Sequence, residues 1–291
     1  MNRKPRPFVV IVLALAAILI AWPARAAAQD VEIGALLGWN FSGINSNYSY
    51  SFVPPFPNKP YSGSGAIAFD LKNHSAGLGY GGFVNFAMRD HWFLQFSYNR
   101  FSTDLVAPVT SYVLGLQYTA SSPAGTPPQP FTYSSTVDWP ALQGTMKNSV
   151  LNFDAVYRVG STRGPALDLI GGLSYFHFSG SFQSLAVTRF ALDTDGGLTS
   201  EQFGLAVNFG PKNALGANGG VGLTIRFNSN FGLFVEGRYY YCPPISTATE
   251  YSVIALSGQT ALSLSTVNFH RDAFKVNPSF LSLQCGLKVM L

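Results

Sequence analysis

The chain has 291 residues, of which 47% are apolar and only 11% are charged. A soluble domain typically carries roughly 25% charged residues, and the 14% aromatic content excludes intrinsic disorder. A membrane-spanning helix needs about 20 apolar residues, and the only such stretch lies at the extreme N-terminus. High apolarity, 29 glycines and the lack of an internal apolar stretch of that length together point to a membrane β-barrel.

The N-terminus has the organisation of an export signal. Basic residues at positions 3, 4 and 6 precede an apolar run over residues 8–20, and small residues follow at 24–28. A positive region, an apolar region and an A-x-A-like cleavage site, in that order, are typical of a secretory signal peptide. We therefore predict a signal peptide over residues 1–28 and an outer-membrane β-barrel domain over residues 29–291.

Removal of this segment changes the charge balance. Four of the 18 basic residues lie in residues 1–28, which hold no acid, so 14 basic and 14 acidic residues remain. The mature chain is formally neutral, and no basic face remains that would support nucleic-acid binding.

Eight segments alternate between apolar and polar residues, as half-buried strands do. Their second face is mostly Gly, Ser and Asn, whereas a soluble sandwich would need larger side chains there. In hydrocarbon, an open sheet would expose unpaired edges. We therefore predict an all-β fold, an antiparallel up-and-down transmembrane β-barrel of eight strands, with ten strands as the alternative. The predicted strands cover residues 31–42, 77–88, 92–99, 151–159, 167–175, 217–227, 231–241 and 281–291.

Short and long connections alternate between these segments. Short turns join three of the pairs, at residues 89–91, 160–164 and 228–230, and long stretches join the others. Outer-membrane barrels have short periplasmic turns and long external loops. This arrangement predicts periplasmic N- and C-termini and extracellular long loops.

Aromatic residues provide an independent check, because both membrane interfaces of such barrels carry aromatic girdles. With this topology the aromatics of the strands fall into two bands. The outer band comprises Trp39, Phe41, Tyr80, Tyr98, Tyr175, Tyr239 and Tyr241, and the periplasmic band comprises Phe86, Trp92, Tyr157, Phe227 and Phe231.

The pattern over residues 30–291 resembles the OmpA-type, Opa-like and OmpW-like outer-membrane barrels of Gram-negative envelopes. The last eight residues fit the C-terminal signal that the barrel assembly machinery reads in this group, through Gln284, Gly286, Val289 and Leu291. The final Leu291 stands where the family more often has Phe. The resemblance implies an integral cell-envelope protein whose partners are outer-membrane lipid or lipopolysaccharide and, during insertion, the assembly machinery; any surface ligand is unknown.

Eight ionisable residues fall on the inward face of the predicted strands. Buried charges must be paired, and here the signs balance. Counting from the short turns places Arg158 diagonal to Asp168, and barrel closure places Lys288 beside Glu32, so we predict two close ion pairs. The full set is Glu32, Asp154, Asp168, Glu236, Arg158, Arg226, Arg238 and Lys288.

An eight-stranded interior is just wide enough to be filled by side chains. We therefore expect a structural or surface-interaction role rather than a general-diffusion porin. A narrow channel, or transport of small hydrophobic molecules, is the alternative. We expect no cofactor and no metal, because the glycine-rich residues 77–82 are not followed by a helix and the four histidines have no metal-like spacing.

A second alternative is enzymatic. His177 and Ser179 form a His-x-Ser tripeptide at the end of a predicted strand, similar to that of the lipid A deacylase family. A histidine beside a serine can activate it for attack on an ester. A third, acidic partner is expected in that family, and Glu201 is the candidate for that role.

Three further expectations concern the loops and the cysteines. The alternation continues in phase through residues 112–118, 185–187 and 203–209, which predicts that the third to sixth strands extend well past the membrane as tall hairpins. The first long loop, with prolines between positions 54 and 60, should be irregular because proline cannot join a ladder. Cys242 and Cys285 fall on opposite faces and are predicted to be free thiols.

Overall fold

The computed structural model describes residues 31–42, 44–53, 61–73, 76–89, 91–119, 130–135, 141–160, 164–192, 198–247, 249–257, 268–270 and 274–291. Residues 1–30 lie outside these ranges, so the signal peptide and the domain boundary stay predictions. Within the described ranges, no helix is long and apolar enough to cross a membrane.

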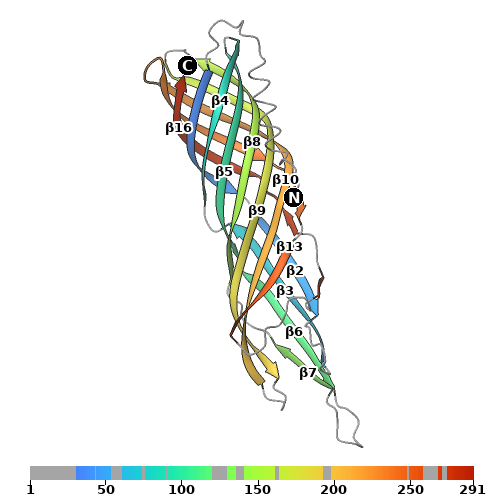
Figure 1. The fold of residues 1–291 in the computed structure, drawn as a ribbon. Coiled ribbons are helices and arrows are strands. Elements are labelled where there is room, and N and C mark those ends of the chain that lie inside the picture. Colours follow the sequence, from blue (N-terminus) through green and yellow to red (C-terminus); the bar gives the residue numbers. More distant parts are fainter. Residues whose placement is uncertain are drawn as a thin grey trace, which may run out of the picture.

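Eight antiparallel strands form a closed ring (Figure 1). The β1 strand pairs with β16 on one side and with β4 on the other, so the ring has no free edge. The eight predicted segments are these eight strands, and the ten-stranded alternative is wrong. In ring order they are β1 (Val31–Ser42), β4 (Gly77–Arg89), β5 (Trp92–Ala107), β8 (Leu142–Gly160), β9 (Ala166–Leu192), β10 (Leu198–Arg226), β11 (Phe231–Tyr241) and β16 (Phe280–Met290).

The two faces of the ring have opposite polarity. Leu37, Leu173 and Leu287 lie on the outside with more than 60% of their surface exposed, whereas Asn40 and Asp154 are fully buried inside. Water would disfavour this arrangement, and hydrocarbon favours it, because the apolar band meets lipid and every ring strand is paired. The chain is a transmembrane β-barrel.

Aromatic side chains mark both ends of the apolar band. Those of the predicted outer band are all exposed, and Trp92, Phe227 and Phe231 of the other band are exposed beside the short turns. Phe86 and Tyr157 of that second band are half-buried. Hereafter the end with the short turns is called the turn end and the opposite end the tall end.

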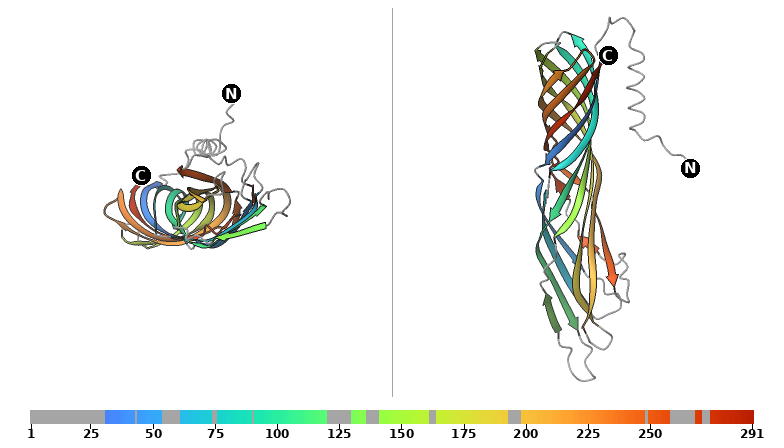
Figure 2. Two further views of the ribbon diagram at one scale, coloured as in Figure 1. Left: turned by 90° about the horizontal axis from the view of Figure 1, so that it is seen from below. Right: turned by 90° about the vertical axis from the view of Figure 1, so that its left-hand side faces the viewer.

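Four ring strands, β5, β8, β9 and β10, continue beyond the barrel at the tall end. The β9 strand has 27 residues and β10 has 29, whereas a membrane span needs about 9–11. Their ladder runs from Ala166 opposite Thr224 to Leu192 opposite Leu198. The predicted tall hairpins are therefore confirmed for the β8–β9–β10 region, and they give the molecule its elongated shape (Figure 2, right).

Further strands extend these hairpins into what we call the tall sheet. In the tall sheet, β13 pairs with β10. On the other side of the sheet, β3 pairs with β5, β2 and β6; β14 then pairs with β2, and β7 pairs with β6. Among the described residues, β7, β13 and β14 each pair with one strand, so no pairing there closes the tall sheet as the barrel is closed. These strands are β2 (Asn45–Val53), β3 (Tyr61–Asn73), β6 (Val109–Thr119), β7 (Pro130–Ser135), β13 (Thr249–Ser257) and β14 (Asn268–His270). A separate ladder joins β12 (Ile245–Thr247) to β15 (Phe274–Val276).

Two expectations about the loops are wrong. The first long loop is not irregular throughout, because β2 and β3 form a paired hairpin from Asn45 opposite Lys72 to Phe52 opposite Gly65. The prolines that motivated that expectation fall in residues 54–60, outside the described residues. Likewise residues 109–119 form a strand, but they leave β8 and pair with β3 and β7.

The predicted outward orientation of Val207 and Phe209 is also wrong. Val207 and Phe209 face the interior and are buried, although the pattern placed them outward. The cause is a bulge between Phe209 and Lys212, where β10 advances by one residue more than β9. Gly210 has a φ of 82° at this point, a conformation that favours glycine. One extra residue exchanges the two faces of a strand.

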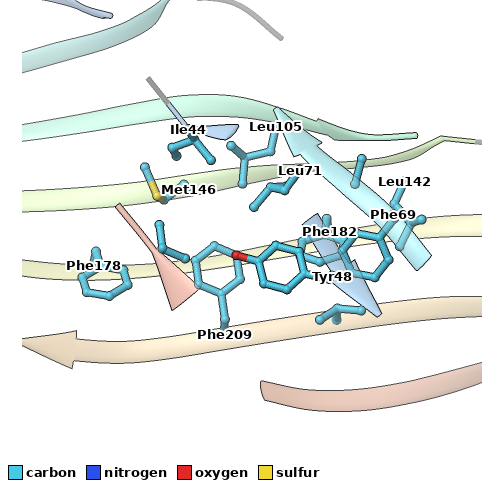
Figure 3. Close-up of a cluster of buried hydrophobic side chains, with 13 residues drawn as sticks. Ile44, Tyr48, Phe69, Leu71, Leu105, Leu142, Met146, Phe178, Phe182 and Phe209 are labelled. Atoms are coloured by element: carbon cyan, nitrogen blue, oxygen red, sulfur yellow. The ribbon is translucent and has the colours of Figure 1, made fainter. Parts of the chain in front are cut away.

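The tall sheet has a hydrophobic core of its own (Figure 3). Phe69 and Phe182 meet edge to face with ring centroids 5.4 Å apart, and Phe209 packs 6.2 Å from Phe182. The Tyr48 hydroxyl donates a hydrogen bond to the Lys275 carbonyl, which ties β15 to this core. The buried members are Ile44, Tyr48, Phe69, Leu71, Leu105, Ala107, Leu142, Met146, Phe178, Phe182, Val207, Phe209 and Val276.

Candidate functional site

The lumen near the turn end holds a cluster of five charges around Glu32, which we call the Glu32 cluster. The Glu32 carboxylate accepts hydrogen bonds from Arg158 Nη1 at 2.6 Å, from Lys288 Nζ at 3.1 Å and from Arg226 Nη2 at 3.2 Å. Arg158 Nε also donates to Asp168 Oδ1 at 2.6 Å. The Arg158 guanidinium thus bridges two carboxylates, and both predicted ion pairs are present.

The register corrects one detail of the predicted pairing. Arg158 lies directly opposite Asp168 on the neighbouring strand, where sequence counting placed them diagonally. Lys288 lies opposite Gly34, two positions along β1 from Glu32, so this pair is diagonal. Directly opposite residues approach more closely than diagonal ones, which suits the bidentate contact of Arg158.

A second cluster lies nearer the tall end and centres on Arg238. Its guanidinium donates to Glu236 Oε1 at 2.6 Å, to Asp154 Oδ2 at 2.6 Å and to Gln95 Oε1 at 2.7 Å. Asn218 donates to Asp154 Oδ1 at 2.7 Å. All eight predicted lumen charges therefore belong to one of two networks with buried, hydrogen-bonded partners, as charges out of water require.

Aromatic side chains close the lumen at the tall end. Tyr240 and Phe280 stack with ring centroids 4.6 Å apart, and Phe101 lies 5.0 Å from Phe280. Phe176 meets Tyr240 edge to face at 6.4 Å, and all four side chains are buried. We call this group the aromatic closure. The two charge networks fill the lumen between the turn end and the aromatic closure, and the stacked rings of the closure fill the mouth of the lumen.

The cysteines and the C-terminal signal lie on or beside β16. Both cysteines are free, Cys242 buried and Cys285 exposed toward the outside, as predicted. Of the signal residues, Gln284 is buried in the lumen. Gly286 lies so close to Ala35 that an added Cβ would be 1.9 Å from the Ala35 carbonyl oxygen. This contact explains the glycine structurally, and recognition by the assembly machinery stays a prediction.

The outer wall at the tall end changes from apolar to polar between two adjacent cross-strand rows. Tyr98, Leu151, Tyr175 and Leu215 are neighbours across β5, β8, β9 and β10, and we call them the membrane row. Two residues farther along each strand are Arg100, Ser149, His177 and Asn213, likewise neighbours, which we call the polar row. The rows are roughly 7 Å apart, so the interface of the apolar band is sharp.

The candidate histidine and serine lie in and next to the polar row. His177 Nδ1 is 2.7 Å from Asn213 Oδ1, on the neighbouring strand, and both side chains are exposed. With the proton on Nδ1, the ring donates to the amide oxygen and leaves Nε2 free to accept a proton. Ser179 lies two positions after His177, so the two side chains are neighbours on one face.

Glu201 is not the third member of this site. It pairs with Thr188, eleven positions along β9 from His177, which corresponds to roughly 35 Å along the strand. Asn213 occupies the position that Glu201 was expected to fill. Sequence reasoning missed Asn213 because 36 residues separate it from His177, and a long connection rather than a short turn joins β9 to β10, so their register could not be counted.

The chain resembles several solved structures at low similarity. The outer membrane protein OprG from Pseudomonas aeruginosa is 11% identical, with 91% of this chain and 96% of that chain covered and a TM-score of 0.41. The outer membrane protease OmpT from Escherichia coli is 9% identical, with 92% and 100% covered and a TM-score of 0.42. Ail, the attachment invasion locus protein of Yersinia pestis, is 11% identical, with 89% and 98% covered and a TM-score of 0.34.

No protein-family model and no curated protein matches the sequence. At these identities and TM-scores, the likenesses say nothing about activity, ligand or partner. The narrower resemblance to OmpA-type and Opa-like barrels stays a prediction.

Proposed function

We propose that the protein is an integral outer-membrane barrel whose sealed interior holds the tall sheet rigidly at the cell surface. The orientation follows the habit of outer-membrane barrels, in which short turns face the periplasm and long connections face outward. The role is then structural or one of surface contact, carried by the tall sheet.

The observation that carries this proposal is the filled lumen. Glu32 and Arg238 each centre a network of buried ion pairs, and the two networks together balance four acids against four bases. The aromatic closure covers the tall-end mouth. Passage of a solute would require breaking charge pairs that are costly to separate, which argues against a porin, a narrow channel and a path for small hydrophobic molecules through the lumen.

Conductance across planar lipid bilayers tests this proposal. The purified barrel is expected to insert without steady ion current, whereas removal of the aromatic closure and one network together, with Phe280→Ala and Arg238→Ala, should open a leak. Reproducible single-channel steps from the wild-type protein at modest voltage would contradict the sealed-barrel proposal and favour the narrow channel.

A second candidate function, hydrolysis of lipid esters, is favoured by one observation: the 2.7 Å contact between His177 and Asn213. In nucleophilic catalysis a third group orients the histidine that activates the nucleophile. Here Ser179 Oγ would attack the ester carbonyl carbon while His177 Nε2 takes its proton. His177 then protonates the departing alcohol, and water attacks the acyl-serine to release the fatty acid. The outward site beside the membrane row is at the depth of lipid ester groups.

Fatty-acid release from lipid esters in mixed micelles tests the second candidate. Ser179→Ala should abolish release, and Asn213→Ala should reduce it by about 10²–10⁴-fold, as loss of an orienting group does. Ser181→Ala changes an exposed serine on the same face of the same strand; it is the matched control and should leave the rate unchanged. Equal release by wild type and Ser179→Ala would exclude this site.

A further inference from the structure

A groove of about 430 Å³ lies on the lipid-facing wall, from Trp92 of β5 across β8 and β9 to β10. Its lining is apolar and combines small residues with aromatic and aliphatic walls. The lining residues are Trp92, Ala155, Tyr157, Leu169, Ile170, Gly171 and Gly220.

The groove is formed by a row of small residues flanked by rows of large ones. Ala155, Gly171 and Gly219 are cross-strand neighbours. A side chain added at Gly171 or Gly219 would have no neighbour closer than 3.8 Å, so the floor is open. Tyr157 and Leu169, which lie opposite each other, form the next row toward the turn end.

The groove and the polar row are separated by about the depth of one lipid leaflet. Gly171 lies six residues from His177 along β9, or roughly 20 Å. A strand tilt of about 45° reduces this to about 14 Å along the barrel axis. The hydrocarbon core of a bilayer is about 30 Å thick, so one leaflet is about 15 Å deep. An acyl chain that starts at the polar row therefore reaches the groove.

Two basic side chains face outward at the polar end of this path. Arg100 is in the polar row, and Lys147 lies opposite Ser102 and Ser179 in the next row. Both side chains are exposed, and within the described residues neither forms an ion pair closer than 4.0 Å. Asp104, the acid on this face of β5, lies opposite Thr145, one row farther from the barrel. His177 is the remaining titratable group of the two rows.

We propose that this wall binds one phosphorylated lipid of the tall-end leaflet, with the phosphate on Arg100 and Lys147 and the end of an acyl chain in the groove. Guanidinium and ammonium groups form charge-assisted hydrogen bonds with phosphate oxygens, and neighbouring serine hydroxyls add donors. In the orientation proposed above, on which the identity of the lipid depends, this lipid is the lipid A part of lipopolysaccharide. Binding itself does not require hydrolysis at Ser179.

Native mass spectrometry of the barrel released from detergent micelles tests this proposal, with diphosphoryl lipid A as the probe and its dephosphorylated form for comparison. Wild type should retain one diphosphoryl lipid. A basic residue near a membrane surface contributes about 1 kcal/mol, or about five-fold in affinity. The double variant Arg100→Gln and Lys147→Gln should therefore weaken retention about 25-fold. Arg89→Gln, which removes an exposed arginine beside a short turn, is the matched control and should bind like wild type.

Two further variants test the contribution of the groove. Gly171→Leu fills the groove and should weaken retention roughly three-fold, since only dispersion contacts are lost in hydrocarbon surroundings. Ala217→Leu adds bulk on the same wall outside the lining and should have no effect. Equal retention of the phosphorylated and dephosphorylated lipids, or of wild type and the Arg100/Lys147 variant, would overturn the proposal. A protein dimer in place of a lipid adduct would also overturn it. An intact bound lipid supports binding alone, and a lipid lacking one acyl chain supports binding together with the ester hydrolase.

Discussion

The barrel and the tall sheet share β5, β8, β9 and β10 but have opposite polarity. Along β9 the outward residues change from Leu173 and Tyr175 to His177 and Ser181, while the inward residues change from Ser174 to Phe176 and beyond. The alternation does not slip at this point, so only the chemistry of each face is exchanged. The same strand thus has a polar interior inside lipid and an apolar interior inside water. We infer that the exchange point, between the membrane row and the polar row, lies at the surface of the membrane.

The two interiors are also stabilised differently. The barrel interior contains charge pairs, and removal of one partner leaves a buried charge without compensation. The tall sheet is stabilised by dispersion and the hydrophobic effect, as a soluble core is. Variants of the barrel interior should therefore lose stability through unpaired charges, and variants of the tall sheet through lost packing contacts.

The largest expected effect comes from breaking the Glu32 cluster. Glu32→Gln removes the carboxylate that three basic groups share, which should lower the free energy of unfolding by about 3–5 kcal/mol. Urea unfolding in lipid vesicles measures the loss. Arg100→Gln, an exposed charge on the wall, should change stability by less than about 0.5 kcal/mol. A loss below about 1 kcal/mol for Glu32→Gln would show that the buried pairs are not the main determinant of barrel stability.

A core truncation in the tall sheet should act locally. Phe182→Ala removes a buried ring from the core in Figure 3 and should cost about 3 kcal/mol. Hydrogen exchange of the β9 amides beyond Tyr175 should then accelerate about 100-fold, while residues 166–175 exchange as in wild type. Uniform acceleration over the whole strand would mean that the barrel and the tall sheet unfold as one unit.

One strand allows the two surroundings to be compared with the same substitution. Leu173→Arg places a cation against lipid and should cost about 2–3 kcal/mol. Ser181→Arg, also outward on β9 and exposed, lies in water and should cost less than about 0.5 kcal/mol. Unfolding titrations of both variants give the difference, and equal costs would place both residues in the same medium.

How much of this could be predicted from the sequence differs between the two regions. In the barrel, strict alternation over β1, β4 and β16 fixes which side chains meet lipid, so the strand number and the buried charges could be predicted. In the tall sheet, the bulge at Gly210 exchanges the faces of β10, and a pattern of apolar residues cannot show that an extra residue is present. The contact of His177 with Asn213 keeps the barrel register, but a long connection joins the two strands, so no short turn fixed that register in the sequence.

The smallest expected effect is chemical and concerns the two thiols. Burial raises the pKa of the Cys242 thiol, which follows β11, to about 11. Since the thiolate is the reactive form, alkylation of Cys242 at pH 8 should be very slow and should rise about ten-fold for each pH unit up to about pH 10. Mass spectrometry after treatment with a maleimide at pH 8 should therefore show little labelling of Cys242. Rapid labelling of Cys242 at pH 8 would show that the mouth of the barrel is open.

The central claim, that the membrane ends where the polarity of the strands is exchanged, is tested most directly by depth measurement along β9. Single cysteines at the outward positions from Leu167 to Gln183, in a background with Cys242→Ser and Cys285→Ser, would carry a spin label in lipid vesicles. Oxygen partitions into lipid, whereas a nickel chelate stays in water. The logarithm of the ratio of oxygen accessibility to nickel-chelate accessibility is expected to change sign between Tyr175 and His177. A change of sign more than two residues away from that step, or none along the strand, would contradict the claim.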